Sequence, residues 1–128
     1  MILNTDSMKP IYVQVAEWLE TEILCENIKE EERIYSQYQL AGMFNINPAT
    51  AAKGLNILAD EKIVYKKRGL GMFVSTDAKK LILDKRRNQT LKQLVLELVA
   101  EADCLGVDEH QLAEMIRQAK KRNKEEGL

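Results

Sequence analysis

Apolar side chains recur at intervals of three and four residues along most of this chain, and that spacing is typical of amphipathic helices. The first such stretch follows Pro10, a residue suited to a first helical turn, and it carries Ile11, Val15, Trp18, Leu19 and Ile23. Two shorter stretches lie over residues 36–44 and 47–60, after a polar connector at 27–33. The pattern therefore predicts three helices before residue 61.

The second and third predicted helices are joined by a very short turn, and each begins with its own capping signal. Ser36 followed by Gln39 is a capping box, in which each residue satisfies a backbone N–H near the other. Asn47 followed by Pro48 supplies a good N-cap and a good first helical residue. Two short helices joined in this way form the helix-turn-helix motif.

A short β-hairpin is predicted directly after the third helix. Residues 63–65 and 72–74 are rich in strand-forming side chains, and Gly69 and Gly71 permit a tight reversal between them. Three helices followed by a hairpin give the element order of a winged helix. We therefore expect a winged helix-turn-helix domain over residues 1–75.

Beyond residue 75 the apolar pattern is purely helical. Seven apolar residues between positions 91 and 105 fall on one helical face, and the helix starts there or as early as residue 78. Gly106 ends this helix, and Asp108 with Gln111 caps a second one, before a charged tail at 120–128 that we expect to fray. The expected fold class is mainly α with a small β-hairpin, and a helical hairpin over residues 76–128 follows the winged helix.

This helical hairpin predicts a homodimer. Two helices cannot enclose a hydrophobic core by themselves, and about 50 residues is marginal for independent folding. The simplest partner is the same hairpin of a second copy, which gives a two-fold dimer around a four-helix core. The residues expected at that dimerisation seam are Leu91, Leu94, Val95, Leu98, Val99, Leu105, Leu112, Met115 and Ile116.

Charge is distributed unevenly along the chain, although the formal net charge is only −1. Residues 45–75 hold five basic and two acidic residues and carry +3, whereas residues 1–44 carry −5 and residues 76–128 carry +1. The positive segment contains the helix and hairpin with which a winged helix meets DNA. The near-neutral total therefore does not exclude nucleic acid, and it predicts modest, salt-sensitive non-specific binding.

The sequence argues against several other classes of protein. No apolar run approaches the roughly 18 residues of a membrane span, and the N-terminus lacks a signal-peptide pattern, so the cytoplasm is the expected compartment. Cys25 and Cys104 are expected to be free thiols used as small apolar residues. With one histidine, His110, and no catalytic or phosphate-loop motif, we expect no enzyme and no cofactor. A metal site from these three residues is disfavoured by their wide spacing.

Three sequence blocks within residues 10–75 resemble the N-terminal domain of GntR-type bacterial transcription regulators. The blocks are Pro10-Ile11-Tyr12-Val13-Gln14-Val15, Ser36-Gln37-Tyr38-Gln39-Leu40-Ala41 and Gly69-Leu70-Gly71-Met72-Phe73-Val74, and their spacing also agrees. The short helical C-terminal region and Asn47-Pro48-Ala49-Thr50 are similar to the YtrA-like subfamily. The sequence departs from the family at Tyr38, Pro48 and Ala52, which stand where the family commonly has DNA-contacting arginines.

The resemblance implies a dimeric, sequence-specific DNA-binding regulator, often a repressor of a transporter operon. The expected partner is double-stranded DNA with an inverted-repeat operator, whose half-sites lie about 10 base pairs apart. The residues expected at the DNA are Ser36, Gln37, Tyr38, Asn47, Ala49, Thr50, Lys53, Lys66, Lys67, Arg68, Gly69 and Gly71.

Two questions about partners stay open at the level of sequence. The acidic first helix and the missing family arginines leave a winged-helix protein-interaction module without DNA binding as an alternative. A small-molecule effector is a further open question, and the short helical hairpin leaves little room for an enclosed cavity.

Overall fold

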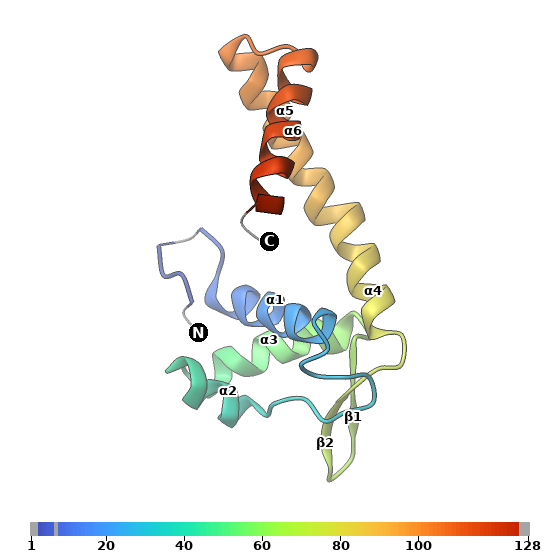
Figure 1. Ribbon diagram of the computed structural model, residues 1–128. Coiled ribbons are helices and arrows are strands. Elements are labelled where there is room, and N and C mark those ends of the chain that lie inside the picture. Colours follow the sequence, from blue (N-terminus) through green and yellow to red (C-terminus); the bar gives the residue numbers. More distant parts are fainter. Residues whose placement is uncertain (1–2, 7, 126–128) are drawn as a thin grey trace. The chain divides into compact units, whose positions relative to one another are not determined.

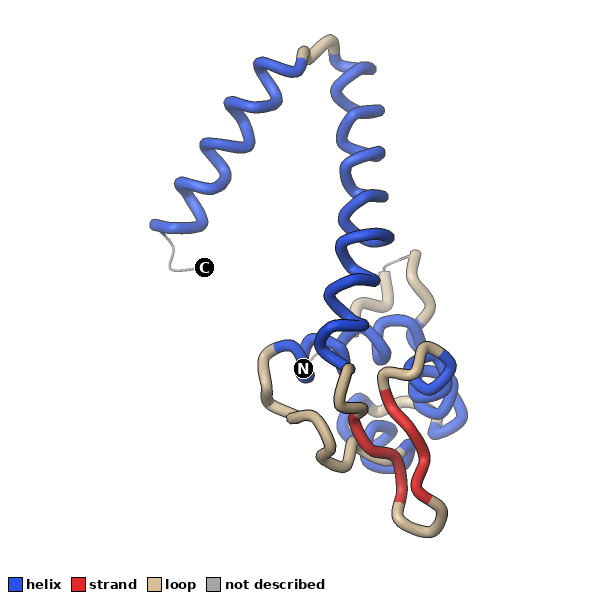
Figure 2. Tube along the Cα trace, turned by 90° about the vertical axis from the view of Figure 1, so that its right-hand side faces the viewer, coloured by secondary structure: helices blue, strands red, loops and turns tan. Residues whose placement is uncertain are grey.

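The computed structural model describes residues 3–6 and 8–125, and Figure 1 shows the order of its elements. The helices α1 (Ile11–Leu24), α2 (Gln37–Phe44) and α3 (Pro48–Asp60) are followed by the strands β1 (Val64–Lys67) and β2 (Gly71–Val74). The C-terminal part contains α4 (Ala78–Lys85), the π-helix η1 (Arg86–Leu91), α5 (Lys92–Leu105) and α6 (Glu109–Glu125). Figure 2 shows the helices and the two strands, and the expected fold class, mainly α with a small hairpin, is confirmed.

The main hydrophobic core forms where α1 packs on α3 and α3 packs on α2. The apolar stripe of α1 is buried as its helical spacing predicts, with Val15, Leu19 and Ile23 fully shielded from solvent. Leu40 of α2 and Leu58 of α3 complete the centre of this core. Burying each of these large side chains contributes about 1.5–3 kcal/mol, so they hold the three helices together.

The turn between α2 and α3 is defined by local hydrogen bonds. Ser36 Oγ accepts the Gln39 backbone N–H (3.1 Å), and the Gln39 side-chain oxygen accepts the Ser36 N–H (2.8 Å). Asn45 ends α2 in the left-handed region (φ +55°), and Asn47 caps α3 two residues later. The predicted helix-turn-helix and both of its caps are confirmed.

The strands β1 and β2 form an antiparallel hairpin, here called the wing, that projects from the helices (Figure 1). Its register pairs Lys67 with Gly71 beside the turn. Residues 31–34 add a third, edge segment, because the Ile34 N–H donates to the Met72 carbonyl (2.9 Å). Part of the stretch expected to be a plain connector is therefore paired with the sheet.

Glu31 ties this edge segment to the wing through side chains. Its carboxylate accepts hydrogen bonds from the Thr76 hydroxyl and from the Tyr65 hydroxyl (2.7 Å). These bonds, that of Thr76 first, hold the pKa of Glu31 below its ordinary value, and the hydrogen bond to Glu31 raises the pKa of Tyr65. The base of the wing is thus held by charge-assisted hydrogen bonds as well as by backbone pairing.

An ion group fixes the end of α4 against α1 and the end of α3. The Lys85 ammonium donates to the carboxylates of Glu20 (2.7 Å) and Glu61 (2.8 Å), and the Glu20 side chain is 1% exposed. Burial alone would lower the pKa of Lys85, but its hydrogen bonds with Glu20 and Glu61 outweigh burial and raise it. We call these three residues the ion triad.

The chain divides into two compact units, Met1–Lys85 and Arg86–Leu128. The first unit extends past residue 75 because α4 buries Ala78 and Ile82 in its core. In the second unit, Gly106 ends α5 in the left-handed conformation (φ +69°) that glycine adopts without strain. Asp108 then exchanges capping hydrogen bonds with Gln111 at the start of α6, so both predicted helix boundaries are confirmed.

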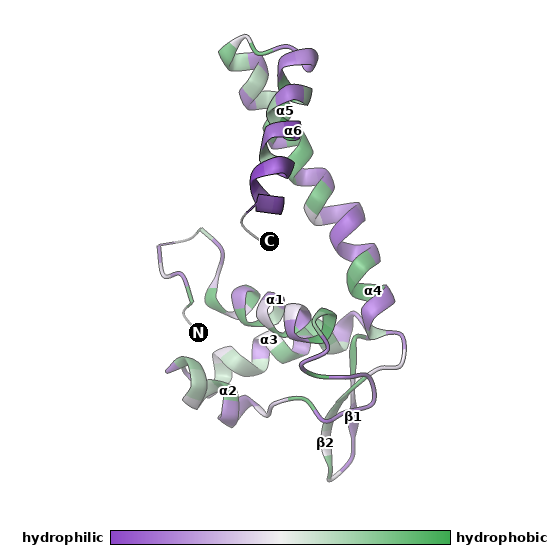
Figure 3. Ribbon diagram, in the orientation of Figure 1, coloured by the Kyte–Doolittle hydropathy of each residue, from purple (hydrophilic) through white to green (hydrophobic). Residues whose placement is uncertain are grey.

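Apolar side chains in the second unit are largely exposed. The helices α5 and α6 diverge from their turn (Figure 2), and Figure 3 shows apolar positions repeating along α5. Eight of the nine residues expected at a dimerisation seam are 42% to 68% exposed, and Leu112 is partly buried. Leu96, outside that expected seam, is exposed as well, so the apolar surface of α5 is broader than the sequence stripe.

Two expectations from the sequence are wrong. Cys25 and Cys104 are exposed free thiols and not small core residues. Cys25 lies beyond the last buried turn as the C-cap of α1, and Cys104 shares a polar face with residues 97 and 101. The charged tail is helical as far as Glu125, since its basic last turn suits a helix C-terminus, and residues 126–128 lie outside the described residues.

Candidate nucleic-acid interface

The start of α3 is fixed by two residues that leave little freedom to its first turn. Asn47 Oδ1 accepts the Ala49 N–H (2.8 Å), and Pro48 occupies the first helical position, where no N–H is needed. Ala49 is exposed and lies two residues after the cap. The helix therefore presents its N-terminal end, with its partial positive charge, at a defined place.

The next turn of α3 carries two further predicted contact residues. Thr50 is half-buried, and Lys53 is exposed. The Lys53 ammonium lies 5.8 Å from the centroid of the Tyr12 ring on α1, within range of a cation–π interaction. Asn47, Ala49, Thr50 and Lys53 thus share the first two turns of one helix.

At the start of α2, the side chains of the predicted contact residues differ in how far they are exposed to solvent. Ser36 is half-buried and engaged in its capping box, so its first role is structural. Gln37 is half-buried and Tyr38 is 72% exposed. Tyr38 therefore offers the most accessible side chain of this group.

The wing supplies the basic side chains expected from the sequence. Lys66, Lys67 and Arg68 are exposed, and the Lys67 ammonium lies 4.3 Å from the centroid of the Phe73 ring. Gly69 and Gly71 have φ values of +78° and +107°, which other residues adopt only with strain. The glycines are therefore required by the turn itself.

A hollow of about 260 Å³ brings together residues from α2, α3 and the wing. Five predicted residues line it, namely Ser36, Gln37, Tyr38, Lys66 and Gly71. Arg33 and Asn56 line it too, and sequence reasoning missed both. The alternation Arg33-Ile34-Tyr35, with a buried Ile34, is the pattern of a short edge strand and was the available signal for Arg33.

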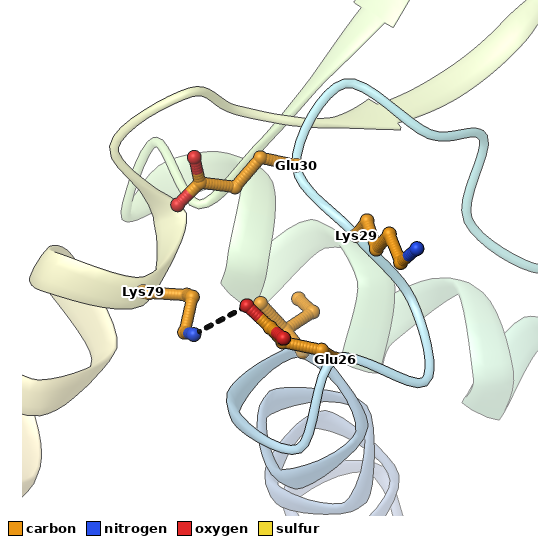
Figure 4. A pocket seen from close by; sticks show the side chains of 5 residues that line it. Glu26, Lys29, Glu30 and Lys79 are labelled. Carbon is orange, nitrogen blue, oxygen red and sulfur yellow. Dashed lines mark hydrogen bonds and ion pairs between the residues drawn. The ribbon is translucent and has the colours of Figure 1, made fainter.

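A second hollow, of about 470 Å³, lies between the end of α1, the following loop and α4 (Figure 4). Its charged residues are Glu26, Lys29, Glu30 and Lys79. The Lys79 ammonium donates to Glu26 (2.9 Å), and this hydrogen bond holds the pKa of Glu26 below its ordinary value. Two cations face two carboxylates here, so this hollow carries no formal net charge.

Over residues 3–6 and 8–125, no cluster of three or more His, Cys, Asp or Glu side chains is placed to hold a metal ion. None of the helices described there combines the length and the apolar character needed to cross a membrane.

Similarity to known proteins covers nearly the whole chain. No protein-family model matches it. The transcriptional repressor YtrA of Bacillus subtilis is 28% identical over 116 residues, which are 91% of this chain and 88% of YtrA. A GntR-family regulator of known structure from Bacteroides thetaiotaomicron is 31% identical with a TM-score of 0.74, covering 89% of this chain and 99% of that one.

A third similarity covers a smaller share of the chain. The DNA-binding domain of AraR, solved in complex with an operator, is 26% identical with a TM-score of 0.54. The match covers 59% of this chain and 95% of the AraR domain.

The helix-turn-helix, the capped α3 and the glycine-tipped wing together define a winged-helix transcriptional regulator. The comparisons specify the class further, because the match to the Bacteroides regulator extends over both units. The chain belongs to the GntR family of transcriptional regulators and resembles its short YtrA-like members. It is accordingly a regulator and not an enzyme.

Proposed function

We propose that the protein is a homodimeric repressor that binds double-stranded operator DNA through α3, the start of α2 and the wing. The observation that carries the proposal is the combination of a capped, exposed α3 N-terminus with a basic wing on one winged-helix unit. Two similar proteins support it: the AraR domain was solved with an operator, and YtrA is named a repressor.

The proposed recognition helix is α3, which would enter the major groove with its first residues leading. Ala49 offers a methyl group to thymine, and Thr50 offers a hydroxyl to a base edge or a phosphate. Lys53 would turn from the Tyr12 ring toward guanine or phosphate. The Asn47 cap fixes the helix end whose dipole favours a phosphate.

The wing and the start of α2 would hold the DNA backbone. Lys66, Lys67 and Arg68 would neutralise phosphates or enter the minor groove. Gly69 and Gly71 would let the wing backbone approach closely, while Gln37, Tyr38 and the cap residue Ser36 would face phosphates at the start of α2. Such contacts orient the protein on the duplex without reading its sequence.

The second unit would provide the dimer. Its exposed apolar residues cover both α5 and α6, and a second copy with the same surface can bury them in a four-helix core. The broad apolar surface of α5, extended by Leu96, fits contacts with more than one helix. A two-fold dimer would then read an inverted repeat with half-sites about 10 base pairs apart.

A gel-shift experiment on the DNA upstream of the protein's own gene tests DNA binding. We expect retardation at low salt that unlabelled upstream DNA competes away more strongly than unrelated DNA does. Lys66→Gln should weaken binding to both DNAs alike. A dimer that retards no DNA at low salt would contradict the proposal and favour the protein-interaction module.

Sedimentation tests the dimer separately from DNA binding. Leu98→Asp places a charge in the proposed seam and should yield a monomer at concentrations where the wild type is a dimer. Gln93→Asp, at an exposed polar position of the same helix, is the matched control and should remain dimeric. A wild-type monomer at all concentrations would contradict this part of the proposal.

The targets and control of the repressor form the last part of the proposal. The resemblance to YtrA-like regulators favours a transporter operon as the target and the cytoplasm as the place of action. Deleting the gene should raise the transcripts of such an operon, and unchanged transcripts would argue against repression. A small-molecule effector would act by changing the spacing of the two recognition helices, and release of operator DNA on titration would reveal it.

A further inference from the structure

Two cations line the 260 Å³ hollow beside the wing. Arg33 is on the edge segment and Lys66 is on β1. Among the described residues, neither side chain forms an ion pair with an Asp or Glu. The second hollow differs, because its Lys79 is already paired with Glu26 (Figure 4). Uncompensated positive charge is therefore a distinguishing feature of the hollow beside the wing.

The wing backbone at Gly71 lies against the Arg33 guanidinium. A Cβ at Gly71 would lie 2.9 Å from Arg33 Nε and 3.3 Å from its Cζ, so the end of the Arg33 side chain would have to move. The absence of a side chain at Gly71 thus lets the guanidinium lie directly against the wing backbone. Arg33 also bridges Phe73 across the edge of the sheet, so its backbone position is fixed. A guanidinium held in this way loses less entropy when it binds an anion.

Ile34, Leu55 and Met72 give the floor of the hollow an apolar part, and polar groups beside the two cations can meet an oxyanion. Asn56 of α3 contributes an amide, and the first residues of α2 contribute Ser36 and Gln37. The hollow therefore joins two cations and several hydrogen-bonding groups from three elements. A phosphate group, with a compact shape and several acceptor oxygens, fits this chemistry.

We propose that this hollow holds one phosphodiester of the DNA backbone and that Arg33, with Lys66, is its main ligand. The inference rests on the proposed DNA binding and adds a residue to it that neither the sequence motifs nor the comparisons indicate. Arg33 would donate its forked N–H groups to the phosphate, and Lys66 would add a point charge. One phosphate bound between the wing and α2 would fix the angle at which α3 enters the groove. Arg33 is thus a positioning residue for recognition.

The test measures how DNA affinity depends on salt, using a labelled duplex of mixed sequence about 30 base pairs long, roughly three helical turns. The slope of log affinity against log salt reports the number of neutralised phosphates, at about 0.9 for each contact. Arg33→Gln should reduce the slope by about one contact and weaken operator and unrelated DNA equally. Arg33→Lys should restore the slope while leaving affinity below the wild type, since the fork is lost.

Lys29→Gln is the matched control, because Lys29 lies on the same connector but lines the second hollow. It removes the same charge and should leave the slope unchanged. Thermal unfolding of each variant shows whether the fold persists. A purely structural role of Arg33 would lower the midpoint and leave the slope of the folded protein unchanged.

The outcomes separate this inference from the proposed function. A wild-type slope in Arg33→Gln overturns the phosphate assignment while DNA binding stands, and failure of the wild type to bind any DNA overturns both. Inorganic phosphate added at constant ionic strength distinguishes the source of the anion. If phosphate alone binds the wild type in an Arg33-dependent manner and the DNA slope is unchanged in Arg33→Gln, the hollow belongs to a free anion and the inference is wrong.

Discussion

At the scale of single residues, Gly54 sets how closely α1 and α3 approach. A Cβ at this position would lie 2.9 Å from the Tyr12 carbonyl oxygen and 3.2 Å from a Val15 methyl group. Alanine would gain about 1 kcal/mol in helix propensity, but overpacking against a backbone oxygen costs about 1–3 kcal/mol. We therefore expect Gly54→Ala to lower the free energy of unfolding by up to about 2 kcal/mol in a urea titration.

Gly42 provides the control for that substitution. It is also helical, but it is exposed and a Cβ there would meet nothing within 4 Å. Gly42→Ala should therefore stabilise the protein by about 0.5–1 kcal/mol. Equal effects of the two substitutions would show that α1 and α3 adjust their separation freely.

Glu31 should make the stability of the folded protein depend on pH in the acid range. Its pKa in the folded protein lies below the ordinary value of 4.5, first through the Thr76 hydrogen bond and then through that of Tyr65. The stabilisation is therefore fully present above the unfolded pKa and is lost as pH falls through the lowered folded pKa. In thermal unfolding, the difference between wild type and Glu31→Gln should be constant near neutral pH and shrink from about pH 5 downward. A difference that grows in acid would contradict this account.

At the scale of elements, the sequence predicted those helix boundaries that are set by hydrogen bonds between residues close together in the chain. The capping box of Ser36 and the cap of Asn47 act over two or three residues, so their motifs alone placed α2 and α3. The edge segment at 31–34 depends instead on pairing with β2, about 40 residues away, and the alternation Arg33-Ile34-Tyr35 was its one local signal. Arg33 was missed as a candidate because its position beside Gly71 depends on this long-range pairing.

Among the contacts between elements, the ion triad is the one whose loss we expect to lower the free energy of unfolding most. Lys85→Met removes a hydrogen-bonded ammonium from the buried Glu20 carboxylate, and the loss of one partner of a buried ion pair costs up to about 3–5 kcal/mol. The expected result is a lower urea midpoint with an unchanged dependence on urea concentration. Lys79→Met is the control, since its partner Glu26 is well exposed and its loss should have little effect. Similar losses for both variants would rule out a special role for the triad.

At the scale of the whole molecule, the two units differ in whether they bury their own apolar side chains. The first unit encloses a core drawn from four helices and the wing, and the sequence stripes predicted most of that core. The second unit exposes its stripes, and a stripe of apolar residues predicts burial without identifying the partner that covers it.

A dimer held by the second unit would make stability depend on concentration. Association stabilises the folded state by mass action, so the thermal midpoint should rise over about a hundredfold increase in protein concentration. Leu98→Asp should remove this rise, which circular dichroism would detect at each concentration. A midpoint that is independent of concentration in the wild type would argue that the second unit is stable without a partner copy.

The ion triad also has a consequence for the lifetime of the folded state. Lys85 is 65 residues from Glu20 and 24 from Glu61 along the chain, so the triad can close only after α1, α3 and α4 have all been brought together. Contacts that form after the rate-limiting step slow unfolding and leave the folding rate nearly unchanged. We therefore expect the triad to determine mainly how long the first unit stays folded. Lys85→Met should raise the unfolding rate far more than it lowers the refolding rate.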